Sequence, residues 1–180
     1  MENFDFTFFF NANILFNDFV DDFFLPEKNQ LLVVKHPGLL MSNRSNFPYE
    51  TNEYSTCYIP GNKGEFYFMG GVNGGDSKKF NRLIVDLKNN VEIDLSKKII
   101  AKWHDESHLN YYMLNANYKI LSEDYIFIEH NYHQKTPKII IRDKNTFGGH
   151  NYLRNLKTDS FTRSKILIKG LLKKLLIIWK

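Results

Sequence analysis

The sequence lacks several features that would indicate particular classes of protein. It has a single cysteine, Cys57, which excludes internal disulfide bonds and favours a reduced, cytoplasmic setting. The net charge is only +4, with the excess largely in the last quarter, so nucleic-acid binding has no electrostatic basis. Residues 1–5 are acidic and lack the cationic start of a signal peptide. The loops G-x-x-x-x-G-K-[ST] and G-x-G-x-x-G are absent, so nucleotide binding of those two kinds is not supported.

Apolar residues are plentiful and predict one domain with a substantial core. They make up 43% of the 180 residues and include 16 Phe and 10 Tyr. Short apolar runs predict strands at 4–10, 31–34, 66–69 and 139–141, the first of them buried. We expect the run 66–69 to be broken by the glycine pair 70–71 and again by the pair 74–75, where the backbone could approach a ligand closely.

A helix is predicted after residue 76. Its apolar residues recur at the i, i+3, i+4 and i+7 positions of a core-facing stripe: Phe80, Leu83, Ile84 and Leu87. Asp76 or Ser77 can cap its first turn, because both side chains can accept a hydrogen bond from a free backbone N–H. We expect this helix to be structural.

The stretch with the most chemistry is 102–110, Lys-Trp-His-Asp-Glu-Ser-His-Leu-Asn. Leu109 and the residues after it have the spacing of a helix face, and Asp105 is predicted to cap that helix. Glu106 then lies in the first turn, where the backbone dipole favours an ionised carboxylate. A carboxylate beside the indole of Trp103 suits glycosyl transfer, since it can attack or stabilise an oxocarbenium-like centre while the ring receives a sugar.

The same stretch allows two other interpretations. One is an ordinary capped helix with solvated His and Asp side chains. The other is a zinc site, because His104 and His108 are four residues apart and could share a helix face. The glutamate does not directly follow the first histidine, however, as the metallopeptidase motif H-E-x-x-H requires.

Residues 103–110 resemble the W-H-D-E-S-H-L-N signature of glycosyltransferase family 6, the family of the blood-group A and B transferases and the α-1,3-galactosyltransferases. Further blocks agree with this family in the same order: residues 8–16, 36–38, 58–60, 65–71, 139–145, 148–150 and Arg154. The resemblance spans nearly all of the chain from residue 8 to residue 154 and is similar to bacterial members in its C-terminal block.

The resemblance implies an α/β fold of the GT-A type, a Rossmann-like nucleotide-sugar transferase fold in a single domain. Residues 1–155 would form the C-terminal portion of the catalytic domain, and 156–180 a basic amphipathic tail. Family members have a further N-terminal portion with the loop that holds uridine, and nothing in the printed sequence corresponds to it. We therefore expect an N-terminally incomplete fold.

The implied reaction is that of a retaining hexosyltransferase. It would move α-GalNAc or α-Gal from a UDP-sugar to the 3-OH of a galactose-containing, for example fucosylated, acceptor glycan. By resemblance, Glu106 is the catalytic carboxylate, either as nucleophile or as the group that holds the acceptor and the developing cation. Asp105 would contact the donor sugar, and Trp103 and His36 the acceptor.

The donor is expected to bind without a metal ion or other cofactor. Asn11 and Asn13 occupy the positions at which animal relatives have the metal-binding D-x-D motif, and two neutral amides are poor hosts for a hard cation. By resemblance, Lys144 and Arg154 would offset the diphosphate charge through charge-assisted hydrogen bonds.

The triplet Met69-Gly70-Gly71 matches the family's sugar-selecting segment. By resemblance, glycine at the third place leaves room for an N-acetyl group, so Gly71 favours UDP-GalNAc as the donor. Met69 favours UDP-Gal, because methionine at the first place accompanies galactose transfer in the animal enzymes. The prediction is GalNAc, with Gal as the alternative.

The last segment, residues 165–180, has a broad apolar face with lysines every fourth residue from Lys165 to Lys173. It is shorter than the ~20 residues that a spanning helix needs. It could lie on an anionic bilayer as a peripheral contact at the inner membrane face, or pack on the domain or on a second subunit. The alternative to the enzyme is a truncated, non-catalytic remnant that binds carbohydrate or membrane.

Overall fold

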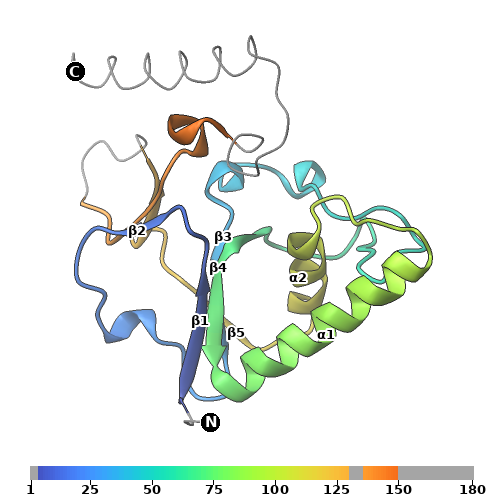
Figure 1. Ribbon diagram of the computed structural model, residues 1–180, viewed down its shortest axis with the longest axis horizontal. Helices are drawn as coiled ribbons and strands as arrows, with labels where there is room; N and C mark the ends of the chain where they lie inside the picture. The colour runs from blue at the N-terminus through green and yellow to red at the C-terminus, as the bar shows by residue number, and fades with distance from the viewer. Residues whose placement is uncertain (1–3, 130–135, 150–180) are drawn as a thin grey trace. The chain divides into compact units, whose positions relative to one another are not determined.

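The computed structural model describes residues 4–129 and 136–149, which belong to two compact units. The first unit contains Met1–Asn11 and Val20–Glu123, and the second contains Ala12–Phe19 and Asp124–Lys180. Both units contain sheet, and the described helices α1 and α2 belong to the first unit (Figure 1). The predicted mixed α/β class is confirmed.

The first unit contains a four-stranded sheet in the order β1-β4-β3-β5. Its strands are β1 (Phe6–Phe10), β3 (Leu31–Lys35), β4 (Phe68–Asp76) and β5 (Tyr118–Ile120). Strand β4 pairs antiparallel with both β1 and β3, and β5 pairs parallel with β3. The predicted strand at 31–34 is therefore confirmed.

Two helices pack on the same side of this sheet, α1 (Ser77–Ser96) and α2 (Asp105–Met113) (Figure 1). They form one apolar core with alternate residues of β3 and the first residue of β4: Leu31, Val33, Phe68, Phe80, Leu83, Leu109 and Met113. The predicted apolar stripe of α1 is confirmed at Phe80 and Leu83, which are buried, and Leu87 is partly buried against the same core. Ile84 is half-exposed, because it lies past the edge of a stripe centred between Phe80 and Leu83.

Helix α1 begins as the sequence predicts. Asp76 is its N-cap, and the carboxylate accepts hydrogen bonds from the backbone N–H groups of Lys78 and Lys79 at 3.0 and 3.1 Å. The backbone N–H of Asn29 donates to the same carboxylate at 3.2 Å. The hydrogen bonds from Lys79 and Asn29 lower the pKa of Asp76 below its ordinary value.

The prediction of a buried strand at 4–10 is wrong in one respect. Strand β1 forms over 6–10, but among the described strands it pairs with β4 alone, so Phe9 has side-chain neighbours on one side of the strand and remains 44% exposed. The other face of β1 is better packed, because the rings of Phe8 and Phe10 contact Phe24, with centroids 4.9 and 6.0 Å apart.

The prediction that the glycine pairs 70–71 and 74–75 break the strand is also wrong. Strand β4 continues through both glycine pairs to Asp76. A β-carbon at Gly74 would collide with Phe8 and lie 2.5 Å from the carbonyl oxygen of Thr7, and one at Gly75 would collide with the carbonyl oxygen of Gln30. Gly75 also has φ of +131°, which disfavours other residues. The second glycine pair thus lets the neighbouring strands approach β4, rather than a ligand.

The second unit contains a three-stranded sheet in the order β2-β7-β6, formed by β2 (Ile14–Phe16), β6 (Ile126–Ile128) and β7 (Ile139–Ile141). Strand β7 pairs antiparallel with β2 and parallel with β6, and confirms the predicted last strand. The predicted boundary at 155 and the tail 165–180 lie outside the described residues. Within the described ranges, neither helix has the length and apolar character needed to cross a membrane.

The glycine requirement of β4 gives a stability prediction. We expect Gly74→Ala to lower the free energy of unfolding by roughly 2–4 kcal/mol, because the added methyl group would displace the backbone of β1. Gly61→Ala is the matched control, since nothing lies within 4 Å of a β-carbon at that position. Urea unfolding followed by circular dichroism measures both variants. Equal midpoints for the two would contradict this account of β4.

Candidate functional site

Glu106 is held by hydrogen bonds to both of its carboxylate oxygens. It lies in the first turn of α2, and the hydroxyl of Tyr67 donates to Oε1 at 2.9 Å. The backbone N–H of Gly70 donates to Oε2 at 2.6 Å. Two donors from β4 and the residue just before it therefore fix the plane of the carboxylate, while each oxygen keeps a lone pair for a ligand.

Tyr67 is a permanent donor to this carboxylate. Its side chain is buried, and burial together with the nearby charge of Glu106 raises the pKa of Tyr67 well above its usual range. Its ring contacts Tyr49, with centroids 5.5 Å apart, and His36 at 6.0 Å. Tyr49 is itself fixed by a hydrogen bond from its hydroxyl to the carbonyl oxygen of Phe66 at 2.7 Å, and burial raises its pKa to about 12. Neither tyrosine loses its proton near neutral pH.

Asn110 ties α2 to β4. Its amide nitrogen donates to the carbonyl oxygen of Phe68 at 2.8 Å, and its amide oxygen accepts from the N–H of the same residue at 2.8 Å. The nitrogen also donates to the carbonyl oxygen of Glu106 at 2.9 Å. Sequence reasoning assigned no role to Tyr67 or Asn110. The i, i+4 spacing of Glu106 and Asn110 was the available signal for the second.

The prediction that Asp105 caps α2 is wrong. His104 is the N-cap, with φ of 54° and ψ of −127°, and its side chain makes no capping hydrogen bond. A hydrogen bond between the chain before the helix and its first turn explains this start. The backbone N–H of Trp103 donates to the hydroxyl of Ser107 at 3.0 Å and so fixes the chain before the helix. Asp105 becomes the first helical residue, and its side chain is exposed.

The predicted acceptor residues lie on two different segments of the first unit. Trp103 is 50% exposed and offers an indole face to solvent. His36 follows β3 and caps the short helix η2 (Pro37–Leu39), with Nδ1 accepting from the N–H of Gly38 at 3.2 Å. Its backbone N–H donates to the carbonyl oxygen of Tyr67 at 2.8 Å, which links the predicted acceptor loop to the residue that holds Glu106.

The predicted donor residues of the first unit also lie together. The backbone N–H of Asn11 donates to the carbonyl oxygen of Gly71 at 2.9 Å. A β-carbon at Gly71 would lie 2.9 Å from both the side-chain nitrogen of Asn11 and the methyl group of Met69. One at Gly70 would lie 3.3 Å from the β-carbon of Glu106. The first glycine pair therefore adjoins both the catalytic candidate and the predicted donor side chains.

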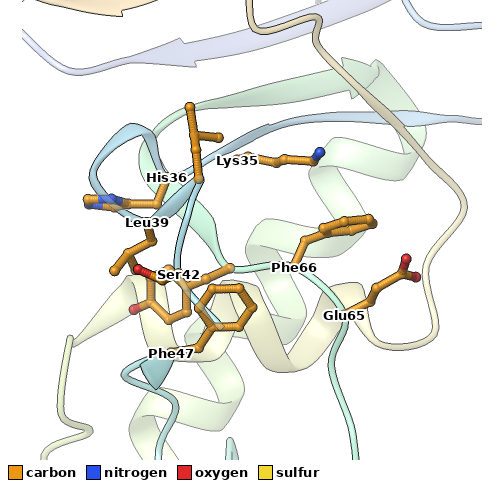
Figure 2. Close-up of a pocket in the computed structure, with 9 residues that line it drawn as sticks. Lys35, His36, Leu39, Ser42, Phe47, Glu65 and Phe66 are labelled. Atoms are coloured by element: carbon orange, nitrogen blue, oxygen red, sulfur yellow. The ribbon is translucent and has the colours of Figure 1, made fainter. Parts of the chain in front are cut away.

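A recess of about 160 Å³ lies beside His36 (Figure 2). Lys35, Glu65 and Phe66 lie on one side of it, and the Lys35 ammonium is 4.5 Å from the centroid of the Phe66 ring. His36 lines the other side (Figure 2). The volume is below the ~300 Å³ at which complete ligand pockets begin, so the recess suits part of a larger ligand.

The remaining predicted donor residues belong to the second unit or lie outside the described residues. The side-chain nitrogen of Asn13 donates to the carbonyl oxygen of Arg142 at 2.8 Å, so this amide connects the residues before β2 to those after β7. Lys144 is the first residue of the short helix η4 (Lys144–Phe147), which Asp143 caps. Arg154 lies outside the described residues. Donor contacts by Asn13, Lys144 and Arg154 stay predictions.

The two histidines considered as zinc ligands have different environments. His104 is exposed at the start of α2, whereas His108 is buried, with Nε2 3.8 Å from Oδ2 of Asp94 in α1.

Comparison with known proteins shows the family to which the chain is similar. The family described as Glycosyltransferase family 6 matches residues 1–155. The chain is 39% identical to the O-antigen biosynthesis glycosyltransferase WbnI of Escherichia coli over 145 residues. These residues are 77% of this chain and 59% of that protein. It is 40% identical over 93 residues to the histo-blood group ABO system transferase 1 of Rattus norvegicus, covering 51% and 27% of the two chains.

A third relative is the globoside alpha-1,3-N-acetylgalactosaminyltransferase 1 of Gallus gallus, 36% identical over 107 residues that cover 59% of this chain and 31% of that protein. The matches thus span at most 59% of the length of these three relatives. The family match extends over most of the present chain and includes every element of the candidate site in the first unit. The resemblance seen in residues 103–110 is confirmed, and the chain belongs to glycosyltransferase family 6.

Proposed function

We propose that this chain is the catalytic portion of a retaining hexosyltransferase with a GT-A fold, which moves α-GalNAc from UDP-GalNAc to the 3-OH of a galactose-containing glycan. The observation that supports this most directly is the carboxylate of Glu106, oriented by Tyr67 and Gly70 and adjoining the Met69-Gly70-Gly71 segment. A fixed anion of this kind is what an oxocarbenium-like transition state requires.

Glu106 acts on the anomeric carbon of the donor in this proposal. As the bond from that carbon to the diphosphate oxygen breaks, UDP leaves with the electron pair and positive charge develops on the sugar. Glu106 either attacks the carbon, and this bond breaks when the acceptor oxygen attacks, or it stabilises the charge and holds the acceptor hydroxyl. In both cases the acceptor oxygen bonds to the carbon and its proton passes to the departing diphosphate. Since the hydrogen bonds to Glu106 already exist before the donor binds, the carboxylate needs no reorientation during the reaction.

The acceptor is proposed to lie between the exposed indole of Trp103 and the loop at His36. An indole face receives the C–H surface of a sugar, and the exposed position of Trp103 leaves that face accessible. The recess beside His36 would take a further part of the glycan. Asp105, exposed at the start of α2, is proposed to contact the donor sugar.

The choice of GalNAc rests on Gly71 and on a relative. By resemblance, glycine at this place leaves room for an N-acetyl group, and a β-carbon there would lie 2.9 Å from the side chains of both Asn11 and Met69. The Gallus gallus relative is named as an alpha-1,3-N-acetylgalactosaminyltransferase, which supports both the sugar and the linkage. UDP-Gal is the alternative donor, and the name of the histo-blood group relative does not separate the two.

Replacing the proposed catalytic carboxylate tests the central claim. We expect Glu106→Gln to lower the rate of transfer by roughly 10²–10⁴-fold while donor binding is retained, because the amide keeps the size of the side chain but loses its charge. The control is Glu92→Gln, an exposed glutamate in α1 that pairs with Lys88. Transfer from UDP-GalNAc and UDP-Gal to a fucosylated galactoside measures both variants.

Three outcomes of this assay are informative. Loss of transfer in Glu106→Gln alone supports the proposal, and an unchanged rate contradicts it. If the unaltered chain binds neither UDP-sugar in calorimetry and transfers nothing, the alternative of a non-catalytic carbohydrate-binding protein is favoured instead.

The role of Tyr67 gives a second prediction. We expect Tyr67→Phe to lower the maximal rate of transfer by roughly tenfold or more with little change in the KM for the donor, since Glu106 loses one of its two donors while the ring remains. Tyr49→Phe is the matched control, because that hydroxyl donates to a carbonyl oxygen and not to Glu106. Equal rates in the two variants would show that the hydrogen bond does not matter for transfer.

Metal independence is proposed because residues 11 and 13 offer amides where a hard cation needs carboxylate oxygens. We expect the Kd for UDP-GalNAc, measured by calorimetry, to be the same with and without added Mg²⁺ or Mn²⁺. A Kd that falls at least tenfold when either cation is added would show that a metal bridges the diphosphate.

A further inference from the structure

Three side chains with different metal-binding atoms meet where α2 packs against the end of α1 and the segment before β4. Cys57 comes from the segment before β4, Asp94 from the last turn of α1 and His108 from α2. They are 0%, 1% and 2% exposed. One sulfur, one oxygen and one nitrogen ligand atom, each from a different side chain, all lie within 4.8 Å of one another.

The imidazole of His108 is incompletely bonded in this cluster. Its Nδ1 is buried and has no hydrogen-bond partner among the described residues. Its Nε2 lies 3.8 Å from Oδ2 of Asp94, which is too long for a hydrogen bond. A buried ring nitrogen without a partner costs free energy, so the His108 ring is incompletely satisfied, and Nε2 is the nitrogen that lies near Asp94 and would bind a ligand in the cluster.

The carboxylate of Asp94 lacks a cationic partner of its own. Ser55 donates its hydroxyl to Oδ2 at 2.5 Å, and the backbone N–H of Thr56 donates to Oδ1 at 2.8 Å, but both donors are neutral. In the described part of the chain, the only ion-pair contact of Asp94 is the long one to His108. A fully buried carboxylate is stable when a positive charge accompanies it, and a bound cation would supply that charge.

A catalytic use of the cluster is excluded by its burial. Cys57 is fully buried, and the hydroxyl of Ser55 contacts its sulfur at 3.2 Å, so a substrate has no access to the thiol. The same burial suits a structural metal site, which is closed to solvent.

We propose that Cys57, Asp94 and His108 bind a structural Zn²⁺ ion. Thiolate, imidazole and carboxylate are the ligands that zinc takes in proteins, at 2.0–2.3 Å. Tetrahedral geometry then places ligand atoms about 3.3–3.8 Å apart, which small side-chain rotations in this cluster would reach, and a buried water molecule would take the fourth position. On binding, Cys57 loses its proton to solvent and coordinates as the thiolate.

The proposed ion would connect three segments that are separate in the sequence. It would join the segment at 55–57 to the end of α1 and to the middle of α2, and His108 is two residues from Glu106 on α2. This site is distinct from the position of a cation at the donor diphosphate, because none of its ligands belongs to the predicted donor residues. Its role is to hold the helix that contains the catalytic candidate.

The test uses the full chain, produced without a metal-affinity tag. We expect about one equivalent of zinc per chain by elemental analysis after zinc is supplied, and a thiolate-to-cobalt charge-transfer band when Co²⁺ replaces it. Cys57 is the only cysteine, so this band can arise from no other side chain. Cys57→Ser and His108→Ala should each lower zinc affinity at least tenfold, and His104→Ala, exposed on the same helix, should not.

Thermal unfolding provides a second measurement that does not depend on activity. Added Zn²⁺ should raise the Tm of the unaltered chain and of His104→Ala, because an ion that binds only the folded state stabilises it, and should leave Cys57→Ser unchanged. The proposal is overturned if the unaltered chain binds less than stoichiometric zinc at saturating concentration, if cobalt binds without the thiolate band, or if Cys57→Ser binds zinc as tightly as the unaltered chain. None of these results depends on sugar transfer, so the proposal can fail while the enzyme is active.

Discussion

Helix α2 is attached to strand β4 by polar contacts, and the candidate site depends on that attachment. Asn110 bonds both backbone groups of Phe68, and two residues further along the same segment Gly70 bonds the carboxylate of Glu106. Because these bonds are directional, they fix the rotation of the helix as well as its position, which apolar packing by Leu109 and Met113 would do less strictly. The position of Glu106 therefore follows from how the helix meets the strand.

Strand β4 has different roles at its two ends, and its C-terminal end is built from glycines. Gly74 and Gly75 pair with β1 on one side and β3 on the other, where side chains would separate the strands. The N-terminal end, at Met69 to Gly71, lies beside Glu106 and Asn11 instead. One strand thus joins a closely paired sheet to a glycine segment that contacts the residues of the candidate site.

Local patterns predicted what depends on local contacts. The strand at 31–34, the cap at Asp76 and the helix after residue 103 follow from neighbouring residues, and the structure contains all three. The course of β4 could not be predicted in this way, because its glycines are explained by Phe8 and Gln30, which are distant in sequence. The role of Tyr67 was missed for the same reason: its partner is 39 residues away, and only the fold brings the two together.

The α-carbon of Gly71 is covered by the ends of two side chains from different segments. One is the terminal methyl group of Met69, at the end of an unbranched thioether chain with three rotatable bonds, and the other is the short amide of Asn11. An unbranched chain of this kind changes rotamer at small energetic cost, whereas a branched side chain would resist. Under the proposed function, room for the acetamido group of a donor sugar would therefore depend on the conformation of Met69 and not on movement of the backbone.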